Sequence, residues 1–229
     1  MAPKVVGVIG GMGPAATAEF FVRLTAATPA TRDEDHLRVL IDSDPRIPSR
    51  SDAILHGGAS PAPRLCEIAQ ELERAGAEIL AMPCNTAHAY LEAMRRSVSV
   101  PVLDMPAEAA ARLDVARVGV LATEASVRAG VFERALAARG IESVRVDEEA
   151  QAAVADVIVA VKAGRPIAPL REVVGRLVAE LARRGAEAVI IGCTEISVVG
   201  VADAPIPGFD ALDALVAATV REALEGERG

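Results

Sequence analysis

The sequence predicts an α/β protein of two similar domains, each with a mostly parallel sheet flanked by helices. Short apolar runs alternate with amphipathic stretches along the whole chain, which is the pattern of parallel strands joined by helices. One local pattern also occurs twice: Gly-Ala-Glu and a short apolar run lead to a cysteine eight residues after the glycine, from Gly76 to Cys84 and from Gly185 to Cys193. This repeat predicts two domains related by a pseudo-two-fold axis, with the two cysteines facing each other across an inter-domain cleft.

The chain begins with a predicted buried strand over Val5–Ile9, a glycine-rich turn, and an amphipathic helix over Pro14–Ala27. Proline suits the first turn of a helix. The glycines of the turn, Gly10, Gly11 and Gly13, allow backbone N–H groups to approach a ligand closely. We therefore expect a cradle for an anionic group at this turn.

A second strand is expected over Leu37–Ile41, followed by a proline-punctuated loop over Asp44–Ser51 and a short helix from Asp52. The loop carries Arg46 and Arg50. Arginine binds carboxylates through two parallel hydrogen bonds. The spacing of these two residues alone nevertheless favours solvated loop arginines.

Each copy of the cysteine repeat has the pattern of a helix ended by glycine, a buried strand and a sharp exit into another helix. The first copy follows a helix over Pro61–Ala75, where Cys66 lies beside the apolar face as a structural or partly exposed thiol, and leads into a helix that ends near Arg96. Cys84 and Cys193 should lie where a strand ends and a helix begins, which is where open α/β sheets bind ligands. The positive end of a helix dipole at that place favours thiolate over thiol.

The second domain is expected to alternate in the same way. After a stretch over Val100–Asp104, the predicted elements are strands over Val118–Leu121 and Ile141–Val146, helices over Asp147–Val161 and Pro169–Arg184, a loop over Val199–Pro207, and a closing helix over Ala211–Leu224. Thr123, at a strand-to-helix junction, could cap the helix or contact a ligand, and the cap is the favoured role. The boundary falls near residues 103–106, and the closing helix returns to the first half. We expect one domain from residues 1–104 and 207–229 and the other from residues 105–206.

Composition excludes several classes of function. The formal charge is −8, and the chain has no Trp, one Tyr and four Phe, which argues against nucleic acid as a partner. No apolar run approaches the roughly 18–20 residues that span a membrane. The three cysteines are an odd number in a chain without a secretory signal, which predicts reduced thiols in the cytoplasm.

Two thiols at equivalent junctions suit one kind of chemistry. Inverting the α-carbon of an amino acid needs a base on each face, together with groups that stabilise the developing carbanion. The glycine amides, Asn85 and Thr86 beside one sulfur, and Thr194 beside the other supply such groups. No lysine motif for pyridoxal phosphate is evident, so we expect no cofactor. We also expect no metal, because a Cys84/His88 pair would need a further ligand, and His36 and His56 lack metal-like spacing.

Three segments resemble the aspartate/glutamate racemase family: Gly10–Pro14, Cys84–His88 and Gly192–Glu195. The resemblance covers nearly the whole chain. It implies two similar α/β domains around a cleft, usually in a homodimer, and amino-acid racemisation without pyridoxal phosphate. It also implies that Cys193 deprotonates the L-enantiomer and that Cys84 deprotonates the D-enantiomer.

Similarity to the aspartate racemase branch around Ile47–Arg50 and Val161–Gly164 implies that Arg50 and Lys162 hold the side-chain carboxylate, with aspartate as the expected substrate. Position alone instead favours Lys162 as a partner of the helix dipole. Glu195 either caps its helix or assists Cys193. The substrate-binding candidates are Met12, Gly13, Arg50, Asn85, Thr86, Thr123, Lys162, Thr194 and Glu195.

Several alternatives stay open. The substrate could be glutamate or another amino acid, and the related activities are those of hydantoin racemase and maleate isomerase. A non-catalytic module that binds small anions belongs to a different class. Gly11, Gly13 and Ala16 match a weak dinucleotide-binding motif. His88 could orient the Cys84 thiol, although a helix-cap or packing role is favoured over that and over a metal site.

Overall fold

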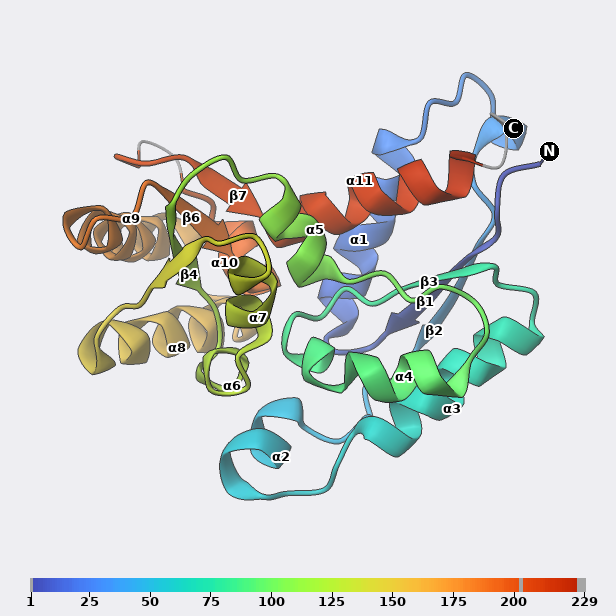
Figure 1. Cartoon of the computed structure of the whole chain (residues 1–229), viewed down its shortest axis with the longest axis horizontal. Helices are drawn as coiled ribbons and strands as arrows, with labels where there is room; N and C mark the ends of the chain where they lie inside the picture. The colour runs from blue at the N-terminus through green and yellow to red at the C-terminus, as the bar shows by residue number, and fades with distance from the viewer. Residues whose placement is uncertain (1, 202–203, 226–229) are drawn as a thin grey trace. The chain divides into compact units, whose positions relative to one another are not determined.

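The computed structural model describes residues 2–201 and 204–225, and it confirms the predicted α/β class with two parallel sheets flanked by helices. The chain divides into one unit of residues 1–105 and 212–229 and a second unit of residues 106–211. Figure 1 shows the elements of both units. Among the described residues, no helix is long and apolar enough to cross a membrane.

The first unit contains a three-stranded parallel sheet in the order β2-β1-β3. The central strand is completely buried, whereas β2 is an edge strand of mixed exposure. The bounds are β1 Val6–Gly10, β2 Val39–Ser43 and β3 Ile79–Ala81. The predicted stretch after Pro101 forms only an isolated parallel bridge, between Leu80 and Val102.

Helices cover both sides of this sheet (Figure 1). Their bounds are α1 Pro14–Ala27, α2 Arg50–His56, α3 Ala62–Arg74, α4 Leu91–Ser97 and α11 Ala211–Leu224, with short 3-10 helices η1 Asp33–Asp35 and η2 Thr86–Tyr90. The apolar core between the sheet and α3 and α4 includes Cys84. The closing helix joins this unit through a backbone hydrogen bond from Lys4 N to Ala223 O, 2.9 Å, and an ion pair between Arg23 and Asp213, also 2.9 Å.

The second unit contains a four-stranded parallel sheet in the order β5-β4-β6-β7. Its strands are β4 Arg117–Leu121, β5 Glu142–Val144, β6 Ala188–Ile191 and β7 Gly208–Asp210. Its helices are α5 Met105–Ala111, α6 Glu124–Arg128, α7 Val131–Ala137, α8 Glu148–Lys162, α9 Ile167–Arg183 and α10 Thr194–Val199. The core of the unit includes Cys193, just as the other core includes Cys84.

The helix terminators of the cysteine repeat are confirmed. Gly76 and Gly185 have φ of +97° and +90°. The residue after each glycine donates its backbone N–H to a leucine carbonyl five residues earlier, Ala77 to Leu72 and Ala186 to Leu181, both at 3.0 Å. Both copies therefore turn from helix into strand in the same way, and this turn fixes where each cysteine emerges.

Several predicted elements differ from the structure. The second strand covers 39–43 rather than 37–41. The helix α2 begins at Arg50 rather than at Asp52, because Ser49 caps it by accepting a hydrogen bond from Asp52 N at 3.2 Å. The residues directly after Cys84 form η2 before α4 begins, rather than one continuous helix.

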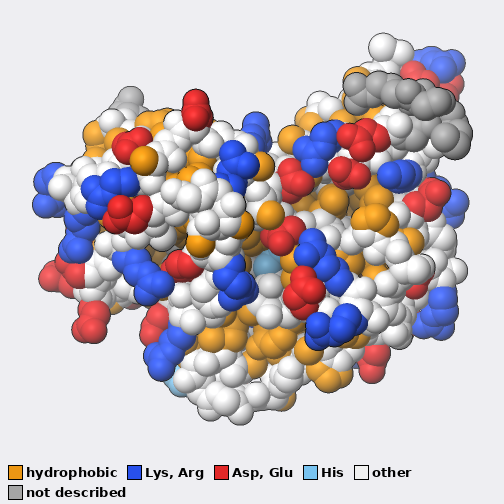
Figure 2. Space-filling model, in the orientation of Figure 1, with side chains coloured by type: hydrophobic (Ala, Val, Ile, Leu, Met, Phe, Trp, Pro, Cys, Tyr) orange, Lys and Arg blue, Asp and Glu red, His pale blue; other side chains and the backbone are white. Residues whose placement is uncertain are grey.

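Figure 2 shows the surface seen from the direction of Figure 1. Acidic and basic side chains are interspersed over this face rather than separated by sign. Ion pairs also form within the second unit, such as Arg145 with Glu133 at 2.9 Å and Arg184 with Asp147 at 2.6 Å.

Candidate active site

The glycine turn after β1 is fixed by a threonine one turn into α1. Thr17 Oγ1 accepts a hydrogen bond from Gly11 N at 3.0 Å and donates one to Gly13 O at 3.1 Å. Gly11 has φ +89°, and a Cβ at this position would overlap the backbone of Asp44. A Cβ at Gly13 would meet no atom within 4 Å. The turn therefore packs against the backbone of Asp44 at Gly11, whereas Gly13 faces open space.

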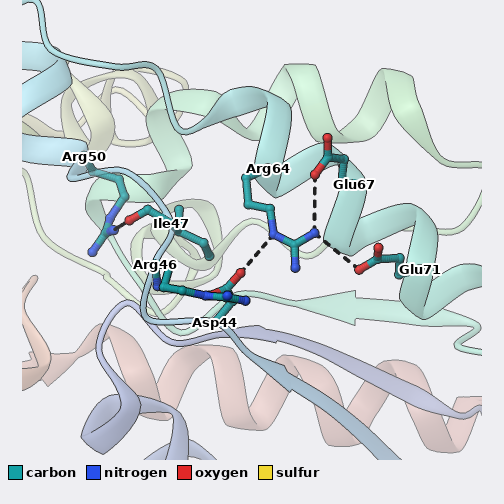
Figure 3. Close-up of polar contacts among 7 residues, drawn as sticks. All are labelled: Asp44, Arg46, Ile47, Arg50, Arg64, Glu67 and Glu71. Carbon is teal, nitrogen blue, oxygen red and sulfur yellow. Dashed lines mark hydrogen bonds and ion pairs between the residues drawn. The ribbon is translucent and has the colours of Figure 1, made fainter.

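Arg50 ties the loop after β2 to this glycine turn. Its Nη1 donates to the carbonyls of Ile47 and Pro48 at 3.2 Å and 3.1 Å, and its Nη2 lies 3.5 Å from Met12 O. Figure 3 shows the guanidinium beside Ile47. Its Nε is buried, and no described residue accepts a hydrogen bond from it. The Arg50 side chain is thus fixed by backbone carbonyls rather than surrounded by solvent, and its Nε–H is available to a further acceptor.

Cys84 lies beyond the carboxyl end of β3, with 9% of its surface exposed. Its carbonyl oxygen lies 2.9 Å from Nδ1 of His88, and the other ring nitrogen, Nε2, accepts a hydrogen bond from Met105 N at 3.2 Å. Because a backbone N–H can only donate, Nε2 carries no proton, and Nδ1 is the donor to Cys84. Burial lowers the pKa of His88, which favours the same neutral form.

The ring of His88 therefore contacts the Cys84 backbone rather than its thiol. Both ring nitrogens are occupied by backbone groups, so His88 is not placed to join Cys84 as a metal ligand. Among the described residues, no group of three His, Cys, Asp or Glu side chains could hold a metal ion.

Asn85 and Thr86 follow the cysteine directly and are buried, with 5% and 7% of their surfaces exposed. The Oδ1 atom of Asn85 is buried, and within the described chain it accepts no hydrogen bond. A buried amide oxygen without a donor costs free energy unless a ligand or water supplies one. Asn85 is thus suited to accept a hydrogen bond from a cationic group.

In the second unit, Cys193 lies at the start of α10, with 7% of its surface exposed. Its Sγ donates to Glu195 Oε2 at 2.9 Å, and Thr194 Oγ1 donates to the same oxygen at 3.3 Å. Glu195 Oε1 lies 3.5 Å from Lys162 Nζ at the end of α8. These contacts join Glu195 to Cys193, and assistance to Cys193 stays a prediction.

Cys193 does not have the lowered pKa that its place at a helix start predicted. Burial raises the pKa of its thiol well above the usual range, and the neighbouring Glu195 carboxylate raises it further. The raised pKa contradicts the expectation of a thiolate at Cys193. The helix has six residues, and its dipole is outweighed by the loss of water around the sulfur.

Thr123 caps α6: its Oγ1 accepts a hydrogen bond from Ser126 N at 3.1 Å. This is the favoured one of its two predicted roles. A contact with a ligand stays a prediction.

Residues 9–219 match the family model described as Asp/Glu/Hydantoin racemase. The chain belongs to this family. It is 32% identical to the aspartate racemase of Picrophilus torridus, a solved structure that superposes with a TM-score of 0.84 over 96% of this chain and 94% of that chain. It is also 27% identical over 223 residues to the broad specificity amino-acid racemase RacX of Bacillus subtilis, covering 94% of this chain and 96% of RacX.

The fold extends to more distant relatives. Glutamate racemase isoform RacE1 from Bacillus anthracis superposes with a TM-score of 0.67 at 15% identity, over 99% of this chain and 82% of that chain. At this identity the likeness concerns the fold alone.

In this member of the racemase family, Asp44 stabilises the loop that carries Arg50. The carboxylate is 6% exposed and accepts from Arg46 N and Nε, both at 3.0 Å, and from Arg64 Nε at 2.9 Å. Arg64 also reaches Glu67 and Glu71, at 3.3 Å and 3.5 Å (Figure 3). The Arg46 hydrogen bonds, with those of Arg64, lower the pKa of Asp44 to about 2.

Sequence reasoning missed four residues in and around the candidate site. Thr17 and Asp44 were placed in a helix and a loop without a role, and Arg64 was one of many charges on an amphipathic helix. Ser197 was also missed; its Oγ lies 3.4 Å from Cys193 O and 2.9 Å from Asp210 Oδ1. A hydroxyl or carboxylate beside a tight glycine turn is the local signal that could have pointed to Thr17 and Asp44.

Proposed function

We propose that this protein racemises an acidic amino acid, aspartate foremost, without a cofactor, using Cys84 and Cys193 as its two bases. One observation carries the proposal. In each of the two parallel sheets, one strand follows the same glycine turn and leads to a buried cysteine just before a helical segment, in a chain of the Asp/Glu/Hydantoin racemase family. Two chemically equivalent bases are what inversion at a carbon acid requires.

In the proposed reaction, one cysteine removes a proton and the other delivers one, so the number of protons is conserved. From L-aspartate, the Cys193 thiolate removes the α-hydrogen and becomes a thiol, while the Cys84 thiol delivers its hydrogen to the opposite face and becomes a thiolate. The D-enantiomer reacts in the reverse sense. The Cys193 thiol that donates to Glu195 is the form that would protonate the carbanion made from D-aspartate.

The remaining candidates divide by the charge that they would hold. Asn85 Oδ1, buried without a donor, suits the α-ammonium group, and the backbone around Gly13, open to space, suits the α-carboxylate. Arg50 and Lys162 suit the side-chain carboxylate. Thr86, Thr123, Thr194 and Met12 complete the proposed set of contacts.

Aspartate is placed first because the Picrophilus torridus aspartate racemase is 32% identical over nearly the whole of both chains. The name of RacX, a broad specificity racemase, supports a second candidate, the racemisation of several amino acids. The two cations proposed for the side-chain carboxylate favour the acidic substrate.

Chiral chromatography of the purified, reduced protein with aspartate, glutamate and alanine tests the proposal. We expect aspartate to be racemised fastest, and Cys84→Ala and Cys193→Ala each to abolish racemisation. Cys66→Ala is the matched control, because this thiol lies half-buried on α3, within a helix. Full racemisation by either active-site variant would refute the two-base assignment, and equal rates on all three amino acids would favour the broad-specificity candidate.

A further inference from the structure

The carboxylate of Glu195 is divided between two tasks within the second unit. Its Oε2 accepts the Cys193 thiol hydrogen at 2.9 Å and the Thr194 hydroxyl at 3.3 Å, and its Oε1 faces Lys162 Nζ at 3.5 Å. The side chain of Glu195 is 17% exposed. A largely buried carboxylate therefore lies between a nucleophilic sulfur and a cation, with both oxygens in use.

Lys162 is the more exposed partner of this pair. It is the last residue of α8, its side chain is 63% exposed, and the chain turns away directly afterwards at Gly164, where φ is +67°. Four rotatable side-chain bonds allow its ammonium group to exchange one acceptor for another at little cost. The same ammonium is proposed above to hold the side-chain carboxylate of the substrate. A carboxylate of the protein thus lies where a carboxylate of the substrate is expected.

We propose that Glu195 takes the place of the substrate's side-chain carboxylate. Glu195 holds Lys162 in the free protein and releases it when an acidic substrate binds. The inference rests on the proposed function, because it takes Lys162 as a substrate contact. It deepens that function by adding a competition between two carboxylates for one cation.

The exchange has a consequence for Cys193. Once Lys162 has moved to the substrate, Glu195 Oε1 no longer has its cation, whereas Oε2 keeps its contacts to the Cys193 sulfur and to the Thr194 hydroxyl and is in place to accept the thiol proton. The Cys193 S–H bond then breaks as an O–H bond forms on Glu195 Oε2, which leaves the thiolate that removes the α-hydrogen. Glu195 is a positioning residue in this scheme, since it acts through Cys193 and Lys162.

Binding of succinate, a dicarboxylate without an α-amino group, measures the competition by isothermal titration calorimetry. We expect Glu195→Gln to bind succinate about two- to fivefold more tightly than the wild type, the range that a partly exposed ion pair is worth. Lys162→Met should bind it more weakly, and the double variant should match Lys162→Met, because no cation is left to be released.

Glu124→Gln is the matched control. Glu124 follows Thr123 at the start of α6 as Glu195 follows Thr194 at the start of α10, and its side chain is exposed. This variant should bind succinate as the wild type does. Unchanged or weaker binding by Glu195→Gln, with Lys162→Met weakened, would overturn the inference and leave the proposed function standing. Unchanged binding by Lys162→Met would overturn the inference together with the substrate role of Lys162.

Alkylation of Cys193 supplies a readout that does not depend on turnover. In Glu195→Gln, iodoacetamide should modify Cys193 at a lower pH than in the wild type, while Cys66 in the same molecule serves as the internal reference by peptide mass spectrometry. If Glu195→Gln does not fold, Glu195→Asp keeps the charge but withdraws it from both partners, and a smaller shift in the same direction is expected. An unmoved Cys193 profile in a folded variant would overturn the assignment of Glu195 to the thiol.

Discussion

Nδ1 of His88 donates a hydrogen bond to the carbonyl oxygen of Cys84 across 2.9 Å, and the opposite nitrogen of the same ring accepts one from Met105 N. The imidazole thus fixes the backbone of Cys84 from within the core of the first unit. It supplies hydrogen-bond partners to two backbone groups, the carbonyl of Cys84 and the N–H of Met105.

His88→Gln should lower the free energy of unfolding by about 1–3 kcal/mol, because one side-chain amide cannot reach both backbone groups and a buried polar group is left unpaired. Chemical denaturation measures this loss. Racemisation should fall as well, through misplacement of Cys84. A variant with wild-type stability would show that the ring is not an anchor.

Stability should also depend on pH through His88. Burial lowers its pKa in the folded state below the unfolded value, so the unfolded chain binds a proton first as the pH falls. The contribution of the neutral ring is complete above about pH 6.5 and is lost as the pH falls through the lower folded pKa. Denaturation curves of the wild type and His88→Gln between pH 7 and pH 5 should converge towards the acid end.

Asp44→Asn should raise the KM for aspartate more than it changes kcat, because it releases the loop that holds Arg50. The pKa of Asp44 is lowered to about 2, so its stabilising effect is present above the ordinary carboxyl value and is lost as the pH falls towards 2. The stability difference between the wild type and Asp44→Asn should accordingly shrink over this range. A difference that stays constant with pH would contradict the role of the ionised carboxylate.

Two glycines of the turn after β1 should respond differently to alanine. Gly11→Ala should lower the free energy of unfolding by about 1–3 kcal/mol or more. The alanine would have an unfavourable positive φ, and its Cβ would overlap the Asp44 backbone. Gly13→Ala has room for its Cβ and should unfold at the same temperature as the wild type, yet raise the KM by covering the open backbone. Thermal unfolding and kinetics of the pair separate packing from binding.

Arg50→Lys should raise the KM for aspartate about tenfold or more, equivalent to about 1.4 kcal/mol. A lysine keeps the charge but cannot donate to several carbonyls and a carboxylate at once. Arg46→Lys is the control, because this side chain is 86% exposed and only its contact with Asp44 needs a cation. Equal effects of the two variants would contradict the distinction between them.

The repeat around the two cysteines was predictable because its determinants are local. A glycine in the left-handed region and a short apolar run fix both the turn and the strand, and the structure shows both at Gly76 and Gly185. The bounds of α1 and α11 were also predicted, since their apolar periodicity is long and regular. Membership of the racemase family followed from the segments that flank these elements.

The parts that failed depend on contacts distant in the sequence. Arg64 reaches Asp44 across 20 residues, and His88 reaches Met105 across 17, so no local pattern announces either contact. The strand β7 has three residues and lies between the predicted loop and the closing helix, where no element was predicted, because it is defined by pairing with β6 rather than by its own apolar pattern. The protonation of Cys193 depends on burial, which spacing does not reveal.

The most direct test of the two-base account is proton NMR of the reduced protein with each enantiomer of aspartate in deuterium oxide. The account predicts that the wild type produces D-aspartate with deuterium at the α-carbon from L-aspartate, and the converse from D-aspartate. Cys84→Ser should exchange the α-hydrogen of L-aspartate alone, without inversion, and Cys193→Ser should exchange that of D-aspartate alone. Exchange of both enantiomers by one single-cysteine variant, or of neither by the wild type, would contradict it.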